Sequence, residues 1–173
     1  YELKGSLKKD SSITDLLFTS DSKFLLLAWE SNEFVVYRFP ELQVRSTHLH
    51  EDKVIGFAIS GNSEFLASIS VDKVMKIWDR ADGTEKHSVE VDAKCVAFTP
   101  VENLLITGNR DNSISIWNTA GTLKTKIQGH TGPVNDIIVS RRGHLLISGS
   151  SDKTVRGWSL DRHKTTDLLQ GLF

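Results

Sequence analysis

The sequence predicts an all-β protein assembled from four copies of one antiparallel unit. Aromatic residues recur about forty residues apart, at Tyr37, Trp78, Trp117 and Trp158. Short apolar, β-branched runs alternate with turn residues in every copy, and no segment has the pattern of a helix. An all-β array of one supersecondary unit accounts for these observations together.

Other positions recur in the same register as the aromatic residues. Upstream of each aromatic lie a turn residue, a small or apolar residue on the preceding strand, and an apolar residue on the first strand. In chain order these are Ser31, Asp72, Asp111 and Asp152; then Leu27, Ser68, Thr107 and Ser148; then Ile13, Val54, Ala93 and Val134. Agreement at so many positions is not expected by chance, so it indicates a true internal repeat.

Four repeats follow one another, each with four expected strands. The first spans residues 13–53, with strands at 16–18, 24–28, 34–37 and 43–48. The second spans 54–92, with strands at 57–59, 65–68, 74–78 and 86–91. The third spans 93–133, with strands at 96–98, 104–107, 113–117 and 123–127. The fourth spans 134–173, with strands at 136–139, 145–148, 154–158 and 164–169, and residues 1–12 align with the last strand of a preceding repeat.

Composition limits the classes of function. The net charge is −1, which argues against broad binding to nucleic acid or to an anionic membrane. The single cysteine, Cys95, excludes an internal disulfide and a zinc site with several cysteines. No apolar run approaches the roughly 18 residues of a membrane span, and no signal peptide is visible. We therefore expect an intracellular protein of the cytoplasm or nucleus.

The motifs of the repeats resemble those of the WD-repeat family. The Gly-His pair at Gly129, the Ser-Gly-Ser-x-Asp turn at residues 148–152 and the Trp-Asp pair at Trp78 carry the resemblance, which covers essentially the whole chain. It implies a β-propeller in which each repeat is one four-stranded antiparallel blade. We expect residues 1–173 to form one segment, an arc of a roughly seven-bladed propeller. The remaining blades would come from the same parent chain, since the sequence starts at Tyr1. A closed ring of four blades is the alternative, whereas an open arc leaves two apolar blade faces exposed.

A serine, a histidine and an aspartate fall together in the fourth repeat and would also suit nucleophilic catalysis. The resemblance instead implies a buried structural hydrogen-bond network of Trp158, Ser148, His130 and Asp152, which recurs in the second repeat as Trp78, Ser68, His50 and Asp72. Recurrence favours the structural role, because an active site is not copied from repeat to repeat. The third repeat keeps Thr107, Asp111 and Trp117 but has Val89 where the histidine belongs, and the first lacks the network.

No catalytic residue, metal site or cofactor is therefore predicted. His48 and His50 lie at alternate positions of an expected strand, which can place both imidazoles on one face. However, zinc requires three or four ligands, and His50 is already assigned to the network.

Binding to other proteins is the expected activity. In the resembled family, peptides bind at the face where the inner strands begin, here called the top face. The corresponding positions, taken repeat by repeat, are Ser12, Thr14 and Glu30; Lys53, Ile55 and Val71; Asp92, Lys94 and Arg110; and Pro133, Asn135 and Ser151. Lys53, Lys94 and Arg110 would form a basic cluster for an acidic or phosphorylated segment. Trp29, a large residue where other repeats have small ones, either fills space within the divergent first repeat or presents an aromatic anchor to a partner.

The sequence thus favours a non-catalytic scaffold for protein–protein interaction within a larger protein or multi-subunit complex. Two alternatives remain open. One is a regulatory or sensor propeller domain of a larger enzyme, such as an ATPase or a ubiquitin-ligase receptor. The other is an RNA-associated propeller in ribonucleoprotein assembly, which the near-zero net charge disfavours. No membrane partner is expected.

Overall fold

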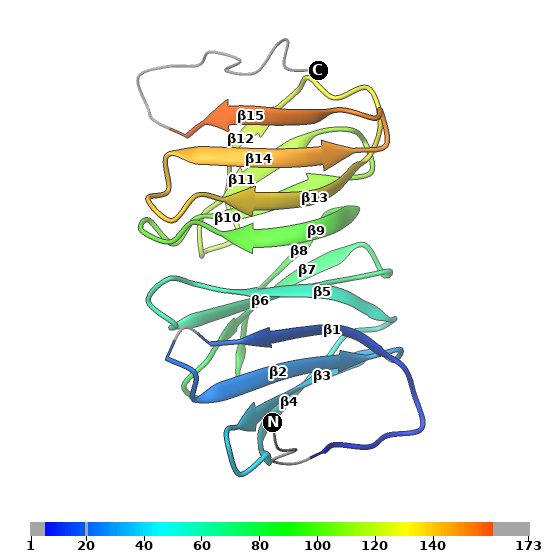
Figure 1. The fold of residues 1–173 in the computed structure, drawn as a ribbon, viewed down its shortest axis with the longest axis vertical. Coiled ribbons are helices and arrows are strands. Elements are labelled where there is room, and N and C mark those ends of the chain that lie inside the picture. The colour runs from blue at the N-terminus through cyan, green and yellow to red at the C-terminus, as the bar shows by residue number, and fades with distance from the viewer. Residues whose placement is uncertain (1–5, 20, 161–173) are drawn as a thin grey trace, which may run out of the picture.

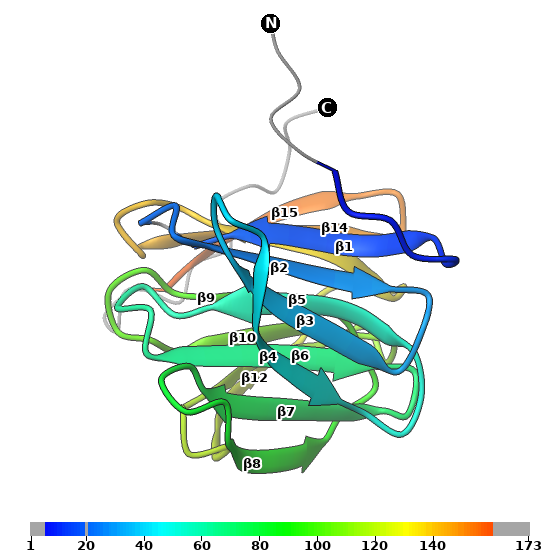
Figure 2. The ribbon, with the colours of Figure 1, turned by 90° about the horizontal axis from the view of Figure 1, so that it is seen from below.

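The computed structural model describes residues 6–19 and 21–160, and within them the chain forms strands and no helix (Figure 1). The predicted all-β fold is confirmed. Four antiparallel sheets follow one another in chain order, and the strands within each sheet pair with their neighbours in sequence. Figure 2 shows this order clearly for the second sheet, where β5 to β8 lie side by side from the middle of the molecule to its lower edge.

The strands of the first sheet are β1 (Ile13–Phe18), β2 (Phe24–Trp29), β3 (Glu33–Arg38) and β4 (Gln43–Leu49). Those of the second are β5 (Val54–Ile59), β6 (Phe65–Ser70), β7 (Val74–Asp79) and β8 (Glu85–Glu90). The third sheet contains β9 (Ala93–Phe98), β10 (Leu105–Asn109), β11 (Ile114–Trp117) and β12 (Leu123–Ile127). The described part of the fourth contains β13 (Val134–Val139), β14 (Leu145–Ser150) and β15 (Val155–Ser159).

Alternation of side chains along the strands gives the inner sheets two buried faces. In the second sheet, Phe57 and Leu66 pack with residues of the first sheet, whereas their neighbours Ala58 and Ala67 pack with residues of the third. Successive side chains of a strand point to opposite faces, so a run of consecutive apolar residues is what a sheet covered on both sides requires. A third cluster joins the third and fourth sheets.

The four sheets form an open arc rather than a closed ring. Figure 1 shows the first sheet at one end of the long axis and the fourth at the other, with β5 and β9 between β1 and β13. The closed four-bladed alternative is therefore not the arrangement of this chain.

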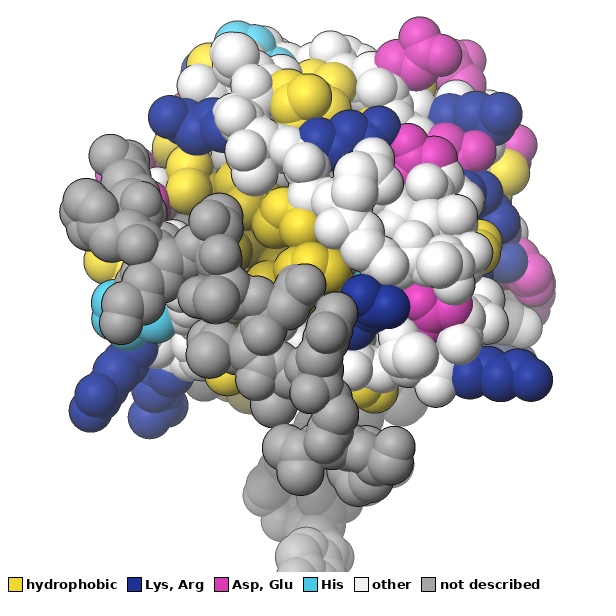
Figure 3. All heavy atoms as spheres, turned by 90° about the horizontal axis from the view of Figure 1, so that it is seen from above, with side chains coloured by type: hydrophobic (Ala, Val, Ile, Leu, Met, Phe, Trp, Pro, Cys, Tyr) yellow, Lys and Arg dark blue, Asp and Glu magenta, His cyan; other side chains and the backbone are white. Residues whose placement is uncertain are grey.

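Both ends of the arc expose positions that are buried inside it. Leu16 of β1 is 59% exposed, whereas Ile137, at the equivalent position of the fourth repeat, is 5% exposed. At the other end Val155 is 64% exposed, and its equivalent Met75 in the second sheet is completely buried. Figure 3, which looks onto the fourth-sheet end, shows hydrophobic side chains at this surface.

Two expected strands differ from the structure or lie outside it. Residues 6–12, predicted to belong to an outer strand, form none, and residues 1–5 lie outside the described residues. Lys9 instead forms an ion pair with Glu33 and lies 4.7 Å from the centre of the Trp29 ring, so this segment is held by side-chain contacts. The strand expected at 164–169 also lies outside the described residues. No helix in the described part of the chain is long and apolar enough to cross a membrane.

The different exposures of Leu16 and Ile137 predict that truncation to alanine lowers the free energy of unfolding by different amounts at these equivalent positions. Ile137→Ala should lower the free energy of unfolding by about 2–5 kcal/mol, because it empties space between two sheets. Leu16→Ala should change it by no more than about 0.5 kcal/mol, because the side chain is already in solvent. Urea denaturation of both variants measures the difference, and equal losses would contradict this packing scheme.

Candidate functional site

A buried hydrogen-bond network joins four side chains in the fourth repeat. The indole Nε1 of Trp158 donates to Ser148 Oγ over 2.8 Å, and Ser148 Oγ lies 2.8 Å from His130 Nε2. His130 Nδ1 lies 2.7 Å from Asp152 Oδ2. These contacts fit an imidazole that donates from Nδ1 to the carboxylate and accepts the serine proton at Nε2. The residues implied by the family resemblance are thus in hydrogen-bond contact.

The second repeat contains the same network. Trp78 Nε1 donates to Ser68 Oγ over 2.9 Å, and Ser68 Oγ lies 2.7 Å from His50 Nε2. His50 Nδ1 lies 3.1 Å from Asp72 Oδ2, and the backbone amide of Glu51 donates to the same oxygen over 3.0 Å. The aspartate thereby ties the segment entering the repeat to the turn between its second and third strands.

The aspartate also shapes its own turn. Asp72 Oδ1 accepts the amide of Val74 over 2.8 Å, and Asp152 Oδ1 accepts the amide of Thr154 over 2.8 Å. Such Asx turns stabilise the left-handed backbone of the intervening residue, which is Lys73 (φ 64°) in the second repeat. An aspartate at this position therefore serves both the turn and the imidazole.

Both aspartates are held in the ionised form. Burial acts to raise the pKa of Asp152, but hydrogen bonds from the Thr154 hydroxyl and from His130 outweigh it and lower the pKa. Burial likewise opposes ionisation of Asp72, whereas the amides of Val74 and Glu51 lower its pKa overall. Burial lowers the pKa of His50 despite the carboxylate beside it, which favours the neutral imidazole.

The third repeat has only part of the network. Trp117 Nε1 donates to Thr107 Oγ1 over 3.1 Å, but no imidazole follows. The residue at the histidine position is Val91, not Val89 as predicted. The backbone shows the equivalence, because the amide of Val91 donates to Lys73 O in the same way that the amide of His50 donates to Asn32 O. Counting residues back from Trp117 gave the wrong position, because the connection from Val91 to β9 is shorter than the connection from His50 to β5.

Without an imidazole partner the aspartate of the third repeat turns to solvent. The side chain of Asp111 is 54% exposed and pairs with Lys126 at 2.7 Å, whereas that of Asp152 is 4% exposed. The same residue type at the same position is thus a surface group in one repeat and part of a buried network in another.

The networks do not have the geometry of a hydrolase site. Ser148 is 1% exposed, and its hydroxyl oxygen is engaged by both Trp158 and His130. A nucleophile must reach a substrate carbon, and this oxygen has no free approach. The arrangement therefore supports the structural role.

His48 and His50 are committed to packing and hydrogen bonding. The His48 ring is 1% exposed, stacks on Phe34 with centroids 4.6 Å apart and meets the edge of Trp78. Its Nε2 lies 2.8 Å from Ser46 Oγ, while Nδ1 has no hydrogen-bond partner. Burial lowers the pKa of His48 to about 4, so the ring is neutral near pH 7.

The predicted top-face residues lie together along one edge of the arc. In each repeat the residue before the inner strand accepts a backbone hydrogen bond from the residue before the turn aspartate. These pairs are Ser12 with Glu30, Lys53 with Val71, Asp92 with Arg110, and Pro133 with Ser151. The edge lies on the right in Figure 1, where β1, β9 and β13 begin.

Carboxylates compensate much of the predicted basic cluster. Lys53 Nζ lies 2.7 Å from Glu30 Oε1, across the boundary of the first and second repeats. Arg110 Nε lies 3.1 Å from Asp92 Oδ1. Lys94 differs from both, because it bonds the neutral amide oxygen of Asn135 in the next repeat. A single sequence cannot reveal these pairs, because they depend on which loops face one another.

The remaining top-face positions divide between structural contacts and exposed surface. The Thr14 hydroxyl lies 3.3 Å from the carbonyl oxygens of both Trp29 and Val54, so it bridges two repeats. Ile55 is half-buried, whereas Val71 is exposed. Asn135 Nδ2 donates to Ser151 Oγ over 3.0 Å.

Trp29 is not available as an exposed anchor for a partner. It is 4% exposed and packs edge-on against Tyr37 with centroids 6.2 Å apart. Of the two roles predicted for it, the structure has the packing role, because the first repeat lacks the hydrogen-bond network and fills this space with apolar side chains.

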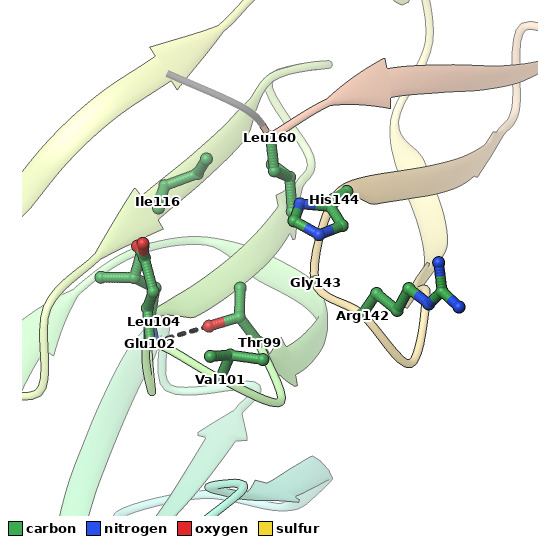
Figure 4. Close-up of a pocket in the computed structure, with 9 residues that line it drawn as sticks. All are labelled: Thr99, Val101, Glu102, Leu104, Ile116, Arg142, Gly143, His144 and Leu160. Carbon is green, nitrogen blue, oxygen red and sulfur yellow. Dashed lines mark hydrogen bonds between the residues drawn. The ribbon is translucent and has the colours of Figure 1, made fainter. Parts of the chain in front are cut away.

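A cavity that the sequence did not predict opens at the opposite edge, between the third and fourth sheets. It has a volume of about 180 Å³ and lies between the β9–β10 and β13–β14 turns. Figure 4 shows Leu104, Ile116 and Leu160 lining it, with His144 at its side. Thr99 Oγ1 accepts the amide of Leu104 over 2.9 Å and fixes one of the two turns. Turn residues in the sequence mark these loops but carry no sign of the space between them.

Comparison with known proteins gives consistent results. A family model described as "WD domain, G-beta repeat" matches residues 41–79, 84–118 and 121–159. The chain is 28% identical over 155 residues to autophagy-related protein 16 of Arabidopsis thaliana, which covers 87% of this chain and 30% of that protein. It is 24% identical over 171 residues to a guanine nucleotide-binding protein subunit beta-like protein of Encephalitozoon cuniculi (strain GB-M1), covering 92% of this chain and 50% of that protein. A solved structure of U3-55K has a TM-score of 0.79 at 22% identity, over 89% of this chain and 50% of that chain. The chain thus spans half or less of the length of these proteins.

The networks predict unequal effects of removing equivalent aspartates. Asp152→Ala should lower the free energy of unfolding by about 2–4 kcal/mol, because it leaves His130 and two backbone amides without an acceptor. Asp111→Ala is the matched control, because it removes the turn hydrogen bonds from Ser113 and an exposed ion pair but no imidazole contact, and it should cost about 1 kcal/mol less than Asp152→Ala. Equilibrium denaturation provides the comparison. A loss below about 0.5 kcal/mol for Asp152→Ala would refute the structural role of the network.

Burial of His48 predicts a loss of stability in mild acid. The unfolded imidazole takes up a proton near its ordinary pKa of 6.5, whereas the folded one does so only near 4. The neutral ring therefore makes its full contribution to folding stability above pH 6.5, and this contribution falls as the pH drops towards 4. The loss of stability across this window is up to about 3 kcal/mol. The free energies of unfolding of the wild type and His48→Phe should accordingly converge or cross as the pH is lowered through this window. Parallel pH profiles of the two proteins would show that His48 is not the titrating group.

Proposed function

Since the chain belongs to the WD40 family of WD-domain, G-beta repeat proteins, we propose that it is a non-catalytic scaffold for protein–protein interaction inside the cell. In this role it would form part of a larger protein or of a multi-subunit complex. One observation carries the proposal: the network residues that recur in the second and fourth repeats are buried, while the top-face residues that differ between these repeats are exposed or half-buried.

The contrast is clearest between the second and fourth repeats. Both use the same tryptophan, serine, histidine and aspartate to hold their turns. The residues that those turns present differ, with Lys53 and Val71 in one repeat and Pro133 and Ser151 in the other. A rigid frame that displays different side chains in each repeat suits recognition of one extended partner across several repeats.

The charges of the top face favour a partner with an acidic segment. Lys53 pairs with Glu30 and Arg110 pairs with Asp92. To bind an acidic partner, each would have to give up its own carboxylate for a carboxylate of the partner. Lys94 bonds the neutral Asn135, and no carboxylate within the described residues forms an ion pair with it. Lys94 is therefore the strongest candidate for the first contact with an acidic side chain, with exposed Val71 available for an apolar neighbour.

Affinity purification with charge-reversed variants tests the proposal. The wild type, the top-face variant Lys94→Glu with Arg110→Glu, and the control Lys86→Glu with Lys124→Glu on outer strands would each be used as bait. Quantitative mass spectrometry should find proteins that the wild type and control retain and that the top-face variant loses by about tenfold or more, which is the effect of about 1.4 kcal/mol. Circular dichroism confirms that each bait is folded. Retention of the same proteins by all three baits would refute the top face as the binding surface.

A further inference from the structure

The third repeat contains a polar cavity of about 440 Å³ between the second and third sheets. We name it the repeat-3 cavity. It is lined by Lys73, Glu90, Val91, Asp92, Asn109, Asp111, Ser115, Trp117, Leu123 and Lys126. Its volume lies within the range of about 300–1,000 Å³ that is usual for ligand pockets. Of the top-face residues described above, only Asp92 lines this cavity.

Two shortened side chains create this space. The second repeat has His50 beside Trp78, and it also has Lys76, whose Nζ lies 5.5 Å from the centre of the Trp78 ring. The fourth repeat has His130 and Arg156 at the same two positions. In the third repeat Val91 and Ser115 replace them, so neither position places an imidazole or a cation on the ring of Trp117, although Lys73 and Lys126 line the same cavity.

The second repeat shows what a cation does at this position. Lys76 Nζ donates to Leu49 O over 3.1 Å and pairs with Glu85 at 3.0 Å, while lying over the indole. It thus combines a carbonyl, a carboxylate and an aromatic face, which together suit a positive group. The third repeat lacks the cation but keeps the aromatic ring.

The two lysines that line the repeat-3 cavity pair with aspartates, which leaves Glu90 without an ion pair and Asn109 Oδ1 without a hydrogen bond among the described residues. Asp111 is paired with Lys126, and Asp92 with Arg110 and more loosely with Lys73 at 3.8 Å. Glu90 forms no ion pair with any described residue. Asn109 is 3% exposed, and its Nδ2 donates to Ser113 and Ser115 while its Oδ1 has no partner.

We propose that the repeat-3 cavity binds an arginine side chain of a partner protein. The guanidinium would lie over Trp117 and donate to Glu90, as the cation of Lys76 lies over Trp78 in the second repeat. Arginine fits better than lysine, because a planar group with five donors can stack on the indole and serve the Glu90 carboxylate and neighbouring acceptors together. This site does not depend on the top face, so either proposal can fail without the other.

Titration with a model arginine tests the site. The probe is N-acetyl-arginine amide, added to the whole chain labelled with ¹⁵N, and N-acetyl-citrulline amide is its neutral control. The arginine probe should shift the indole signal of Trp117 and the amide of Val91 in a saturable manner. The indole signals of Trp78 and Trp158 serve as internal controls and should not move, because His50 and His130 lie beside those rings.

Two variants make the test specific. Glu90→Gln should weaken binding of the arginine probe by about tenfold, since it removes the charge that the guanidinium meets. Glu85→Gln, a matched change at the other end of β8 where the carboxylate pairs with Lys76, should leave binding unchanged. The dispersion of the same spectra shows whether each variant is folded. Absence of a saturable Trp117 shift, an equal response to the citrulline probe, or unchanged affinity in Glu90→Gln would each overturn the proposal.

Discussion

A four-stranded sheet with apolar side chains on both faces cannot be stable without a neighbour on each side, and this constraint organises the whole chain. The second and third sheets satisfy it completely, because Ala67, Leu105 and Ile106 are fully buried between sheets. The first and fourth sheets satisfy it on one face only, as the exposed Leu16 and Val155 show. Stability in such an array comes from interfaces between neighbouring repeats, so the ends and the middle of the arc differ even though their sequences are alike.

The histidine networks act at a more local level. They connect the segment entering a repeat to the turn between its second and third strands, and so fix the loops of the top face. Only two of the four repeats use the complete network. The first replaces it with Trp29 and Tyr37, and the third leaves a polar cavity beside Trp117. The small side chains Val91 and Ser115 thus leave space beside Trp117 where the second repeat has His50 and Lys76.

Much of this architecture could be predicted from the sequence, because it is periodic. The recurring aromatic residues locate the third strand of every repeat, and the resemblance to WD repeats anticipates the contacts of Ser148, His130 and Asp152. The rest depends on features that do not repeat. Val91 takes the histidine position because one connection is shorter, and Glu30 neutralises Lys53 because two loops meet across a repeat boundary. Cavities likewise arise from side-chain sizes on two different sheets, which a pattern along one strand does not contain.

Hydrogen–deuterium exchange in β10 and β14 tests most directly whether burial between sheets dominates stability. Both are the second strand of their sheet and are paired with a strand on each side. The sheet of β10 is covered on both faces but lacks a complete histidine network, whereas the sheet of β14 has the network and one exposed face. If burial dominates, the amides of β10 exchange more slowly than those of β14. Slower exchange in β14 would contradict the account and make the histidine network the main source of stability.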